Sequence, residues 1–205
     1  HPAWHTMMSI ARKNGIANLP FFDDRPSAWS AHAASLYMHS QIESGSTCPT
    51  TMTKACIPLM RLNAPLYVAT GPLLASLEHD ARDVPLAQKR SMTVGMGMTE
   101  KQGGSDVRSN LTQARPTSVD GEYTLHGHKW FTSAPMNDVF LVLAQAPGGL
   151  TCFVLPRVLP DGSRNRLDVV RLKDKLGNRS NASSELEFDG TLVRRLGDEG
   201  RGVRT

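Results

Sequence analysis

The 205-residue sequence lacks the features of several broad classes of protein. No apolar run approaches the length that a membrane-spanning helix needs, and residues 1–5 show no basic region before an apolar core, so no membrane span and no secretory signal are predicted. There are only three cysteines, Cys48, Cys56 and Cys152, and none is spaced as CxxC. Reduced thiols in a cytoplasmic protein are the simplest interpretation. Because the chain does not start with Met, we expect it to be a piece of a longer protein.

The composition is otherwise that of an ordinary globular protein. Aromatic residues make up only 6% of the chain, 40% of residues are hydrophobic and 20% are charged, so there is enough apolar material for one large domain or two modest ones. The net charge is +4, with 23 basic and 19 acidic residues, and the basic excess is greatest after residue 157. Such an excess is able to attract nucleic acid or a nucleotide phosphate. Acidic residues are interspersed there, however, so a solvated surface is the simpler interpretation.

The pattern of apolar residues changes near Arg90. Before it, three- and four-residue spacing predicts helices over 2–13, 27–43 and 51–62, with a kink at Pro58, and a short fourth helix over 74–82. After it, extended segments are predicted at 122–125, 139–143, 150–155, 167–171 and 184–188. Asp120-Gly121 and 147–149 are turn signals between these segments. We therefore predict a helical domain followed by a small antiparallel barrel or sandwich.

Several catalytic, nucleotide-binding and metal-binding motifs are incomplete or absent. Gly95-x-Gly97 would need a third glycine at position 100, which is Glu100, and no βαβ unit surrounds it, so a dinucleotide-binding fold is not supported. No Walker-type stretch and no Gly-x-Ser-x-Gly stretch exists. His126-x-His128 has no recognisable third ligand, which favours surface histidines and predicts no metal site.

Two other motifs carry more information. The segment 98–106 reads Met-Thr-Glu-Lys-Gln-Gly-Gly-Ser-Asp, and the segment 129–133 reads Lys-Trp-Phe-Thr-Ser. Backbone amides near glycines are able to approach a polar ligand closely, and an indole is able to lie against a flat ring. Strict alternation along a strand would place Trp130 and Thr132 on one face. Together these residues suit a planar, redox-active ring.

The order of these motifs resembles the acyl-CoA dehydrogenase family. The resemblance covers residues 96–202 and includes Tyr123-x-Leu125-x-Gly127 and the stretch 175–177, Lys-Leu-Gly. The family usually has Pro after Thr-Glu, whereas this chain has Lys101; together with the stretch 173–183, this is more similar to the AidB-like, alkylation-response branch. The resemblance implies an α+β fold with three parts: an N-terminal helical domain over 1–90, a flavin-binding β domain over 91–198 and, over 199–205, the start of a C-terminal helical domain missing from this chain.

The resemblance also implies an activity and a site. It implies FAD as cofactor, an acyl-CoA as substrate, α,β-dehydrogenation with hydride transfer to the flavin, and a homo-oligomer. The proton-abstracting carboxylate would lie in the missing C-terminal domain, so no catalytic residue is expected here, and the chain alone should be inactive. Glu100 is not its replacement, because it belongs to the motif on the flavin side. The cofactor-binding residues it implies are Met96, Gly97, Met98, Thr99, Gly104, Ser105, Trp130, Phe131 and Thr132.

Two other interpretations stay open. One is an AidB-like flavoprotein associated with DNA protection, in which dehydrogenation is vestigial and DNA is bound through the missing C-terminal region. The other is a helical-plus-β fragment that binds no cofactor and is not an enzyme.

Overall fold

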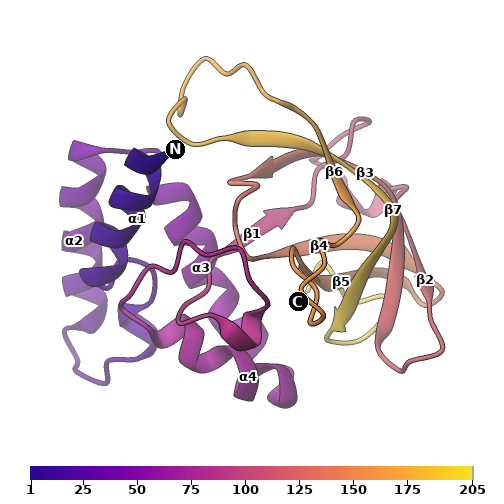
Figure 1. The fold of residues 1–205 in the computed structure, drawn as a ribbon, viewed down its shortest axis with the longest axis horizontal. Helices are drawn as coiled ribbons and strands as arrows, with labels where there is room; N and C mark the ends of the chain where they lie inside the picture. The colour runs from indigo at the N-terminus through magenta and orange to yellow at the C-terminus, as the bar shows by residue number, and fades with distance from the viewer. Residues whose placement is uncertain (205) are drawn as a thin grey trace. The chain divides into compact units, whose positions relative to one another are not determined.

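The computed structural model describes residues 1–204, which form two compact units. The first unit consists of His1–Val94 together with the segment Asp174–Asn181, and the second consists of Gly95–Lys173 together with the chain from Ala182 onward. Figure 1 shows the helices in the first part of the chain and the strands in the second. Within the residues described, no helix combines the length and the apolar character that crossing a membrane requires.

Four α-helices build the first unit. They are α1 (Pro2–Lys13), α2 (Ala28–Ile42), α3 (Thr47–Met60) and α4 (Ala64–Ala75), with short 3-10 turns η1 (Leu19–Phe21) and η2 (Leu86–Gln88). Helix α1 has the predicted bounds, because its apolar positions recur at helical spacing and Gly15 follows it with a φ of 69°. Helix α3 continues through Pro58 to Met60.

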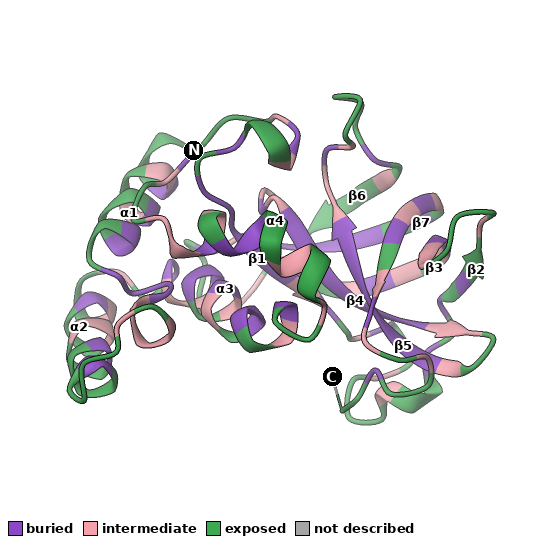
Figure 2. Ribbon diagram, turned by 90° about the horizontal axis from the view of Figure 1, so that it is seen from below, coloured by how far each residue is buried: buried purple, intermediate pink, exposed green. Residues whose placement is uncertain are grey.

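The buried face of α2 differs from the prediction. The apolar residues Trp29, Tyr37 and Ile42, predicted to pack, are 57%, 69% and 79% exposed. The buried positions are instead Ala28, His32 and His39. His39 contacts the Ser46 hydroxyl at 2.7 Å, which satisfies one nitrogen of this buried ring. The helix was therefore predicted correctly from its period, but the face that it buries was not (Figure 2).

The predicted fourth helix is wrong in position. Helix α4 begins at Ala64, where the Asn63 side chain caps it by accepting from the Leu66 amide at 3.1 Å. Two prolines, at 65 and 72, lie in its first and last turns. In the first turn an amide has no intrahelical partner, so proline costs little there. Residues 76–82 form no helix.

Seven strands build the second unit. They are β1 (Val94–Gly97), β2 (Gln113–Pro116), β3 (Glu122–Ser133), β4 (Val139–Ala146), β5 (Gly149–Pro156), β6 (Leu167–Leu172) and β7 (Ser183–Leu196). The sheet order is β1-β3-β2-β4-β5-β7-β6, with β3 also paired to β7. The strands form a closed circuit that begins and ends at β2, through the pairings β2–β3, β3–β7, β7–β5, β5–β4 and β4–β2. The pair β2–β4 is parallel, in contrast to the antiparallel pairing expected throughout.

The core of the second unit lies inside this circuit. Strands β4 and β5 are almost entirely buried and joined by the predicted turn, where Ala146 pairs with Gly149. Gly121, with a φ of 71°, turns the chain between β2 and β3 as Asp120-Gly121 predicted. The apolar side chains that fill the core include Leu125, Phe140, Phe153, Leu186 and Val193.

Candidate functional site

The first motif follows strand β1. Met96 is half-buried and Gly97 buried, both in the strand, and the chain then leaves the strand through Met98, which is 39% exposed, and Thr99, which is half-buried. A tight turn joins Glu100 and Gly103, whose amide donates to the Glu100 carbonyl at 3.1 Å. Gly104 packs against Thr99 so closely that a Cβ there would lie 2.8 Å from the Thr99 hydroxyl. A larger residue at position 104 would therefore displace Thr99.

Backbone hydrogen bonds bring the second motif next to the first. The Trp130 amide donates to the Thr99 carbonyl at 2.8 Å, and Gly97 pairs with Thr132 between β1 and β3. A Cβ on Gly97 would lie 3.1 Å from the Thr132 hydroxyl. The two segments that the sequence singled out thus share one patch of the second unit.

Strict alternation between Trp130 and Thr132, assumed from the sequence, does not hold. Against β7, Lys129 pairs with Leu186 and Thr132 pairs with Ser184, so β3 has one extra residue in this stretch. Such a bulge turns the side chains that follow it. Consequently Lys129 and Thr132 are both buried, Trp130 is half-buried and Phe131 is 45% exposed. Sequence reasoning missed the bulge because no glycine or proline marks it.

The Thr132 hydroxyl is buried and has no hydrogen-bond partner within residues 1–204. Leaving a hydroxyl unpaired away from water costs about 1–3 kcal/mol, and such groups are rare in native structures. An unpaired, buried hydroxyl beside Gly97 is therefore a feature that a bound polar group would explain.

The indole of Trp130 lies among cations. The Lys173 ammonium is 3.4 Å from the centre of the ring, and Lys101 and Arg171 lie at 5.6 and 5.7 Å. Lys173 and Arg171 share the Glu185 carboxylate, at 2.6 and 2.7 Å. Lys173 thus covers one face of the indole, and the positive surroundings favour an electron-rich or anionic ligand.

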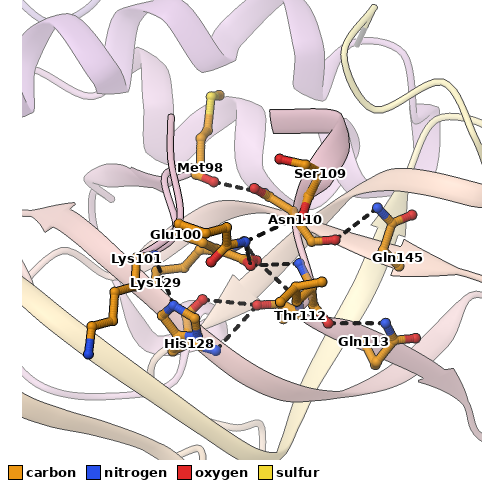
Figure 3. Close-up of polar contacts among 12 residues, drawn as sticks. Met98, Glu100, Lys101, Ser109, Asn110, Thr112, Gln113, His128, Lys129 and Gln145 are labelled. Carbon is orange, nitrogen blue, oxygen red and sulfur yellow. Dashed lines mark hydrogen bonds and ion pairs between the residues drawn. The ribbon is translucent and has the colours of Figure 1, made fainter. Parts of the chain in front are cut away.

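A buried ion pair joins the two motifs, with one partner from each (Figure 3). The Lys129 ammonium contacts the Glu100 carboxylate at 2.6 Å, and neither side chain is exposed. Burial raises the pKa of Glu100, but hydrogen bonds from Lys129 and three other donors outweigh that effect and lower the pKa to about 2. Glu100 is therefore a fully hydrogen-bonded anion and a weak base, which agrees with its exclusion as a catalytic base. Sequence reasoning did not identify Lys129 as its partner, 29 residues away.

Ser105 follows Gly104 in the chain. It is exposed, on the loop before the 3-10 turn η3 (Val107–Ser109), and the Asp106 carboxylate caps that turn by accepting from the Arg108 amide at 3.2 Å. The stretch 175–177, which also contributed to the resemblance, belongs to the segment 174–181 in the first unit, and Leu176 is fully exposed.

The two histidines of strand β3 have separate partners. His126 lies 3.3 Å from Asp189, and His128 accepts a hydrogen bond from the Lys101 amide at 3.0 Å. Across residues 1–204 there is no group of three or more His, Cys, Asp or Glu side chains suited to a metal ion.

A groove of about 410 Å³ lies on the surface of the second unit beside this patch. Lys101, His128 and Trp130 line one part of it, and Asp168 and Glu187 another. Its volume is within the range of small-molecule sites. Its mixed charge does not by itself select a ligand.

Comparison with known proteins defines the class. Residues 1–81 match the N-terminal domain of the adaptive response protein AidB, and residues 95–191 match the middle domain of acyl-CoA dehydrogenases. The order of an N-terminal helical part and a middle β part is the predicted α+β fold, which the structure confirms. The chain belongs to the acyl-CoA dehydrogenase family.

Within that family, AidB is a protein to which this chain is similar. It is 53% identical to AidB of Escherichia coli K12 over the whole chain, which covers 38% of that protein. The structure of Caenorhabditis elegans ACDH-11 in complex with C11-CoA superimposes with a TM-score of 0.86 at 32% identity, over 98% of this chain and 35% of that one. Butyryl-CoA dehydrogenase of Megasphaera elsdenii shares the fold, with a TM-score of 0.74 at 20% identity over 96% and 51%. The chain thus spans little more than a third of the length of AidB and of ACDH-11.

Proposed function

We propose that this chain supplies the flavin-facing surface of an FAD-dependent oxidoreductase of the acyl-CoA dehydrogenase type. The single observation that carries the proposal is the Thr132 hydroxyl, which is buried, unpaired among the residues described and placed beside Gly97. A flavin has hydrogen-bonding atoms along its ring edge that would satisfy such a hydroxyl. The hydrogen bond between Trp130 and Thr99, which joins the two motifs, supports the same conclusion.

The residues present fit an isoalloxazine ring in their chemistry. Thr99 and Thr132 offer hydroxyls, and the half-buried Trp130 offers a flat aromatic surface whose stacking contributes about 0.5–1.5 kcal/mol beyond burial. When bound, the flavin would supply the acceptor for the hydride that leaves an acyl thioester. The remaining proposed contacts are Met96, Gly97, Met98, Gly104, Ser105 and Phe131.

We propose an acyl-CoA as the substrate of the whole protein. The support is the similarity to the Caenorhabditis elegans structure, whose ligand is C11-CoA. Nothing in the chain selects an acyl length. We propose a homo-oligomer by analogy with the family, and a cytoplasmic location because the three free cysteines suit a reducing compartment.

A second candidate function is that of an AidB-like protein associated with DNA, in which dehydrogenation is vestigial. The match of residues 1–81 to the adaptive response protein AidB favours it. The two candidates separate in two measurements on the purified full-length protein. An acyl-CoA that bleaches the flavin absorbance supports the dehydrogenase, whereas DNA binding that weakens steeply with salt supports the second candidate.

The visible absorbance spectrum of the protein after incubation with FAD and desalting tests the proposal, and Thr132→Val tests the observation behind it. The valine removes an unpaired hydroxyl, so the free energy of unfolding of the FAD-free protein should stay unchanged or rise. Loss of one hydrogen bond to the flavin should nevertheless raise the dissociation constant for FAD up to about tenfold. Thr124→Val, on the same strand, serves as the control and should leave FAD binding unchanged.

A protein that stays colourless when the measurement is repeated at full length would refute flavin binding by these residues, whereas colour that appears only at full length would mean that the rest of the protein completes the cleft. Equal FAD affinity of Thr132→Val and wild type would remove Thr132 from the site.

A further inference from the structure

The Glu100–Lys129 ion pair joins the two segments that carry residues we assign to the flavin. Each partner is the sequence neighbour of an assigned residue, because Glu100 follows Thr99 and Lys129 precedes Trp130. Both side chains are completely buried, and their charged atoms are 2.6 Å apart. Desolvating two charges costs several kcal/mol each, and apolar residues of similar volume often stabilise a fold equally well. Stability of the fold is therefore a weak reason for a charged pair at this position.

The Glu100 carboxylate also fastens both ends of the loop that follows it. It accepts from the Leu111 amide at 2.6 Å and from the Thr112 amide at 3.1 Å, and the Gln102 side chain donates to it at 2.8 Å. The Asn110 side chain closes the same loop by donating to the Met98 carbonyl at 2.9 Å. These contacts surround the carboxylate in Figure 3. The loop that carries Gly103 and Gly104 is thus held at its start and at its end by one side chain.

Further bonds hold this loop to strand β3. The Lys101 amide donates to His128, and the Thr112 hydroxyl donates to the His128 carbonyl at 2.9 Å. The ion pair is a charged hydrogen bond, whereas these two bonds to His128 join neutral groups. A charged hydrogen bond is about twice as strong as a neutral one and directional, so it limits how far Thr99 can move relative to Trp130.

We propose that Glu100 and Lys129 are positioning residues, whose ion pair sets the separation and orientation of Thr99 and Trp130 for the flavin. The proposal rests on the proposed function. It places neither residue in contact with the flavin, and it assigns to the pair a role in ligand geometry in addition to the packing of the β domain.

The test is the double variant Glu100→Gln/Lys129→Met in the purified protein. Gln keeps an acceptor for the Leu111 and Thr112 amides, and Met fills the volume of the lysine stem, so the β domain should remain folded. The dissociation constant for FAD should rise on the order of tenfold, as expected when supporting contacts of a site are lost. At saturating FAD the visible absorption band of the bound flavin should also shift, because its surroundings have moved.

Leu125→Ala is the matched control, since Leu125 is a fully buried residue of the same strand that contacts neither motif by any described hydrogen bond. It should destabilise the fold by about 2–5 kcal/mol yet leave the FAD affinity of the folded protein and the flavin spectrum unchanged. If it weakens FAD as much as the double variant does, the pair acts only through stability and the proposal is overturned. Unchanged FAD affinity and spectrum in the double variant would overturn it equally.

A milder variant covers the case in which the double variant does not fold. Gln102→Ala removes one hydrogen bond to Glu100 from an exposed residue, and should raise the dissociation constant for FAD about threefold. An unchanged value there would count against the positioning role. The wild-type protein separates the two levels of the argument, because failure of wild type to bind FAD refutes the proposed function, whereas binding by wild type and variants alike refutes only the positioning role.

Discussion

Arg12 should be the side chain whose loss most weakens the helical unit. It lies in helix α1 with no exposed surface, and its guanidinium donates to four backbone carbonyls. The acceptors are Leu73 at 2.9 Å and Ser76 at 2.7 Å, at the C-terminal end of α4, together with Glu78 at 3.1 Å and Met92 at 3.0 Å. One buried cation thereby satisfies carbonyls that helix α4 and the chain after it leave without helical partners.

The perturbation is Arg12→Met, which keeps the apolar stem and removes the guanidinium. An acceptor left without a partner costs about 1–3 kcal/mol, and part-buried acceptors recover some of this through water. The Leu73 carbonyl keeps the Met92 amide as a donor at 3.3 Å and the Ser76 carbonyl keeps the Asn18 side chain at 3.2 Å, so the loss is counted by hydrogen bonds. At about 1 kcal/mol for each of the four hydrogen bonds lost, the free energy of unfolding should fall by about 4 kcal/mol. Arg12→Lys should recover only a part, because one ammonium does not reproduce the planar fork of donors.

The assay is urea unfolding followed by circular dichroism, which reports the helices. Lys13→Ala is the matched control, since Lys13 is the exposed neighbour in the same helix and its loss should change stability by less than about 0.5 kcal/mol. A loss below about 1 kcal/mol for Arg12→Met would refute the reasoning, because the four carbonyls would then be satisfied without the guanidinium.

Two further predictions concern pH and the glycine loop. The Nδ1 atom of His5 lies 2.9 Å from the Nε2 atom of His79. Burial, with smaller contributions from His5 and Arg12, lowers the pKa of His79 to about 4. Because the unfolded chain binds the proton more readily, the free energy of unfolding should be at its full value above pH 6.5 and fall by up to about 3 kcal/mol towards pH 4. Urea titrations of wild type and His79→Gln check this. An equally steep loss of stability in the variant would contradict it. Gly104→Ala should displace Thr99 and weaken FAD binding with little change in the free energy of unfolding. Gly177→Ala is the control, because its added methyl group meets no atom within 4 Å, and it should change neither quantity. Equal FAD affinity of both variants in an equilibrium titration would contradict a role for the contact between Gly104 and Thr99.

Where the sequence predicted structure correctly, the signal was local. Helix α1 was predicted from its apolar period and the Gly15 that follows it, and strands β4 and β5 from two apolar runs and the turn between them. The fourth helix was predicted over 74–82, whereas α4 covers Ala64–Ala75 and contains two prolines. Their cost depends on where in a helix they fall, which the sequence does not mark.

In the candidate site, too, local motifs were found from the sequence, whereas the arrangement set by strand pairing was not. Two short motifs were enough to single out Thr99 and Trp130, and their spacing carried the resemblance to the family. Which face Thr132 occupies was not predictable, because the bulge in β3 arises only from pairing with β7. The proposed flavin contacts themselves remain predictions.

The sequence by itself therefore determined the order of helical and β parts, most of the elements and the two motifs, since these depend on residues close together along the chain. Only the tertiary structure decided which charges are buried and with which partner. Arg12 reaches carbonyls up to 80 residues away, and Lys129 reaches Glu100 across 29 residues. The physical reason is that the cost of burying a charge is set by the groups that the fold brings around it, and no local pattern records them.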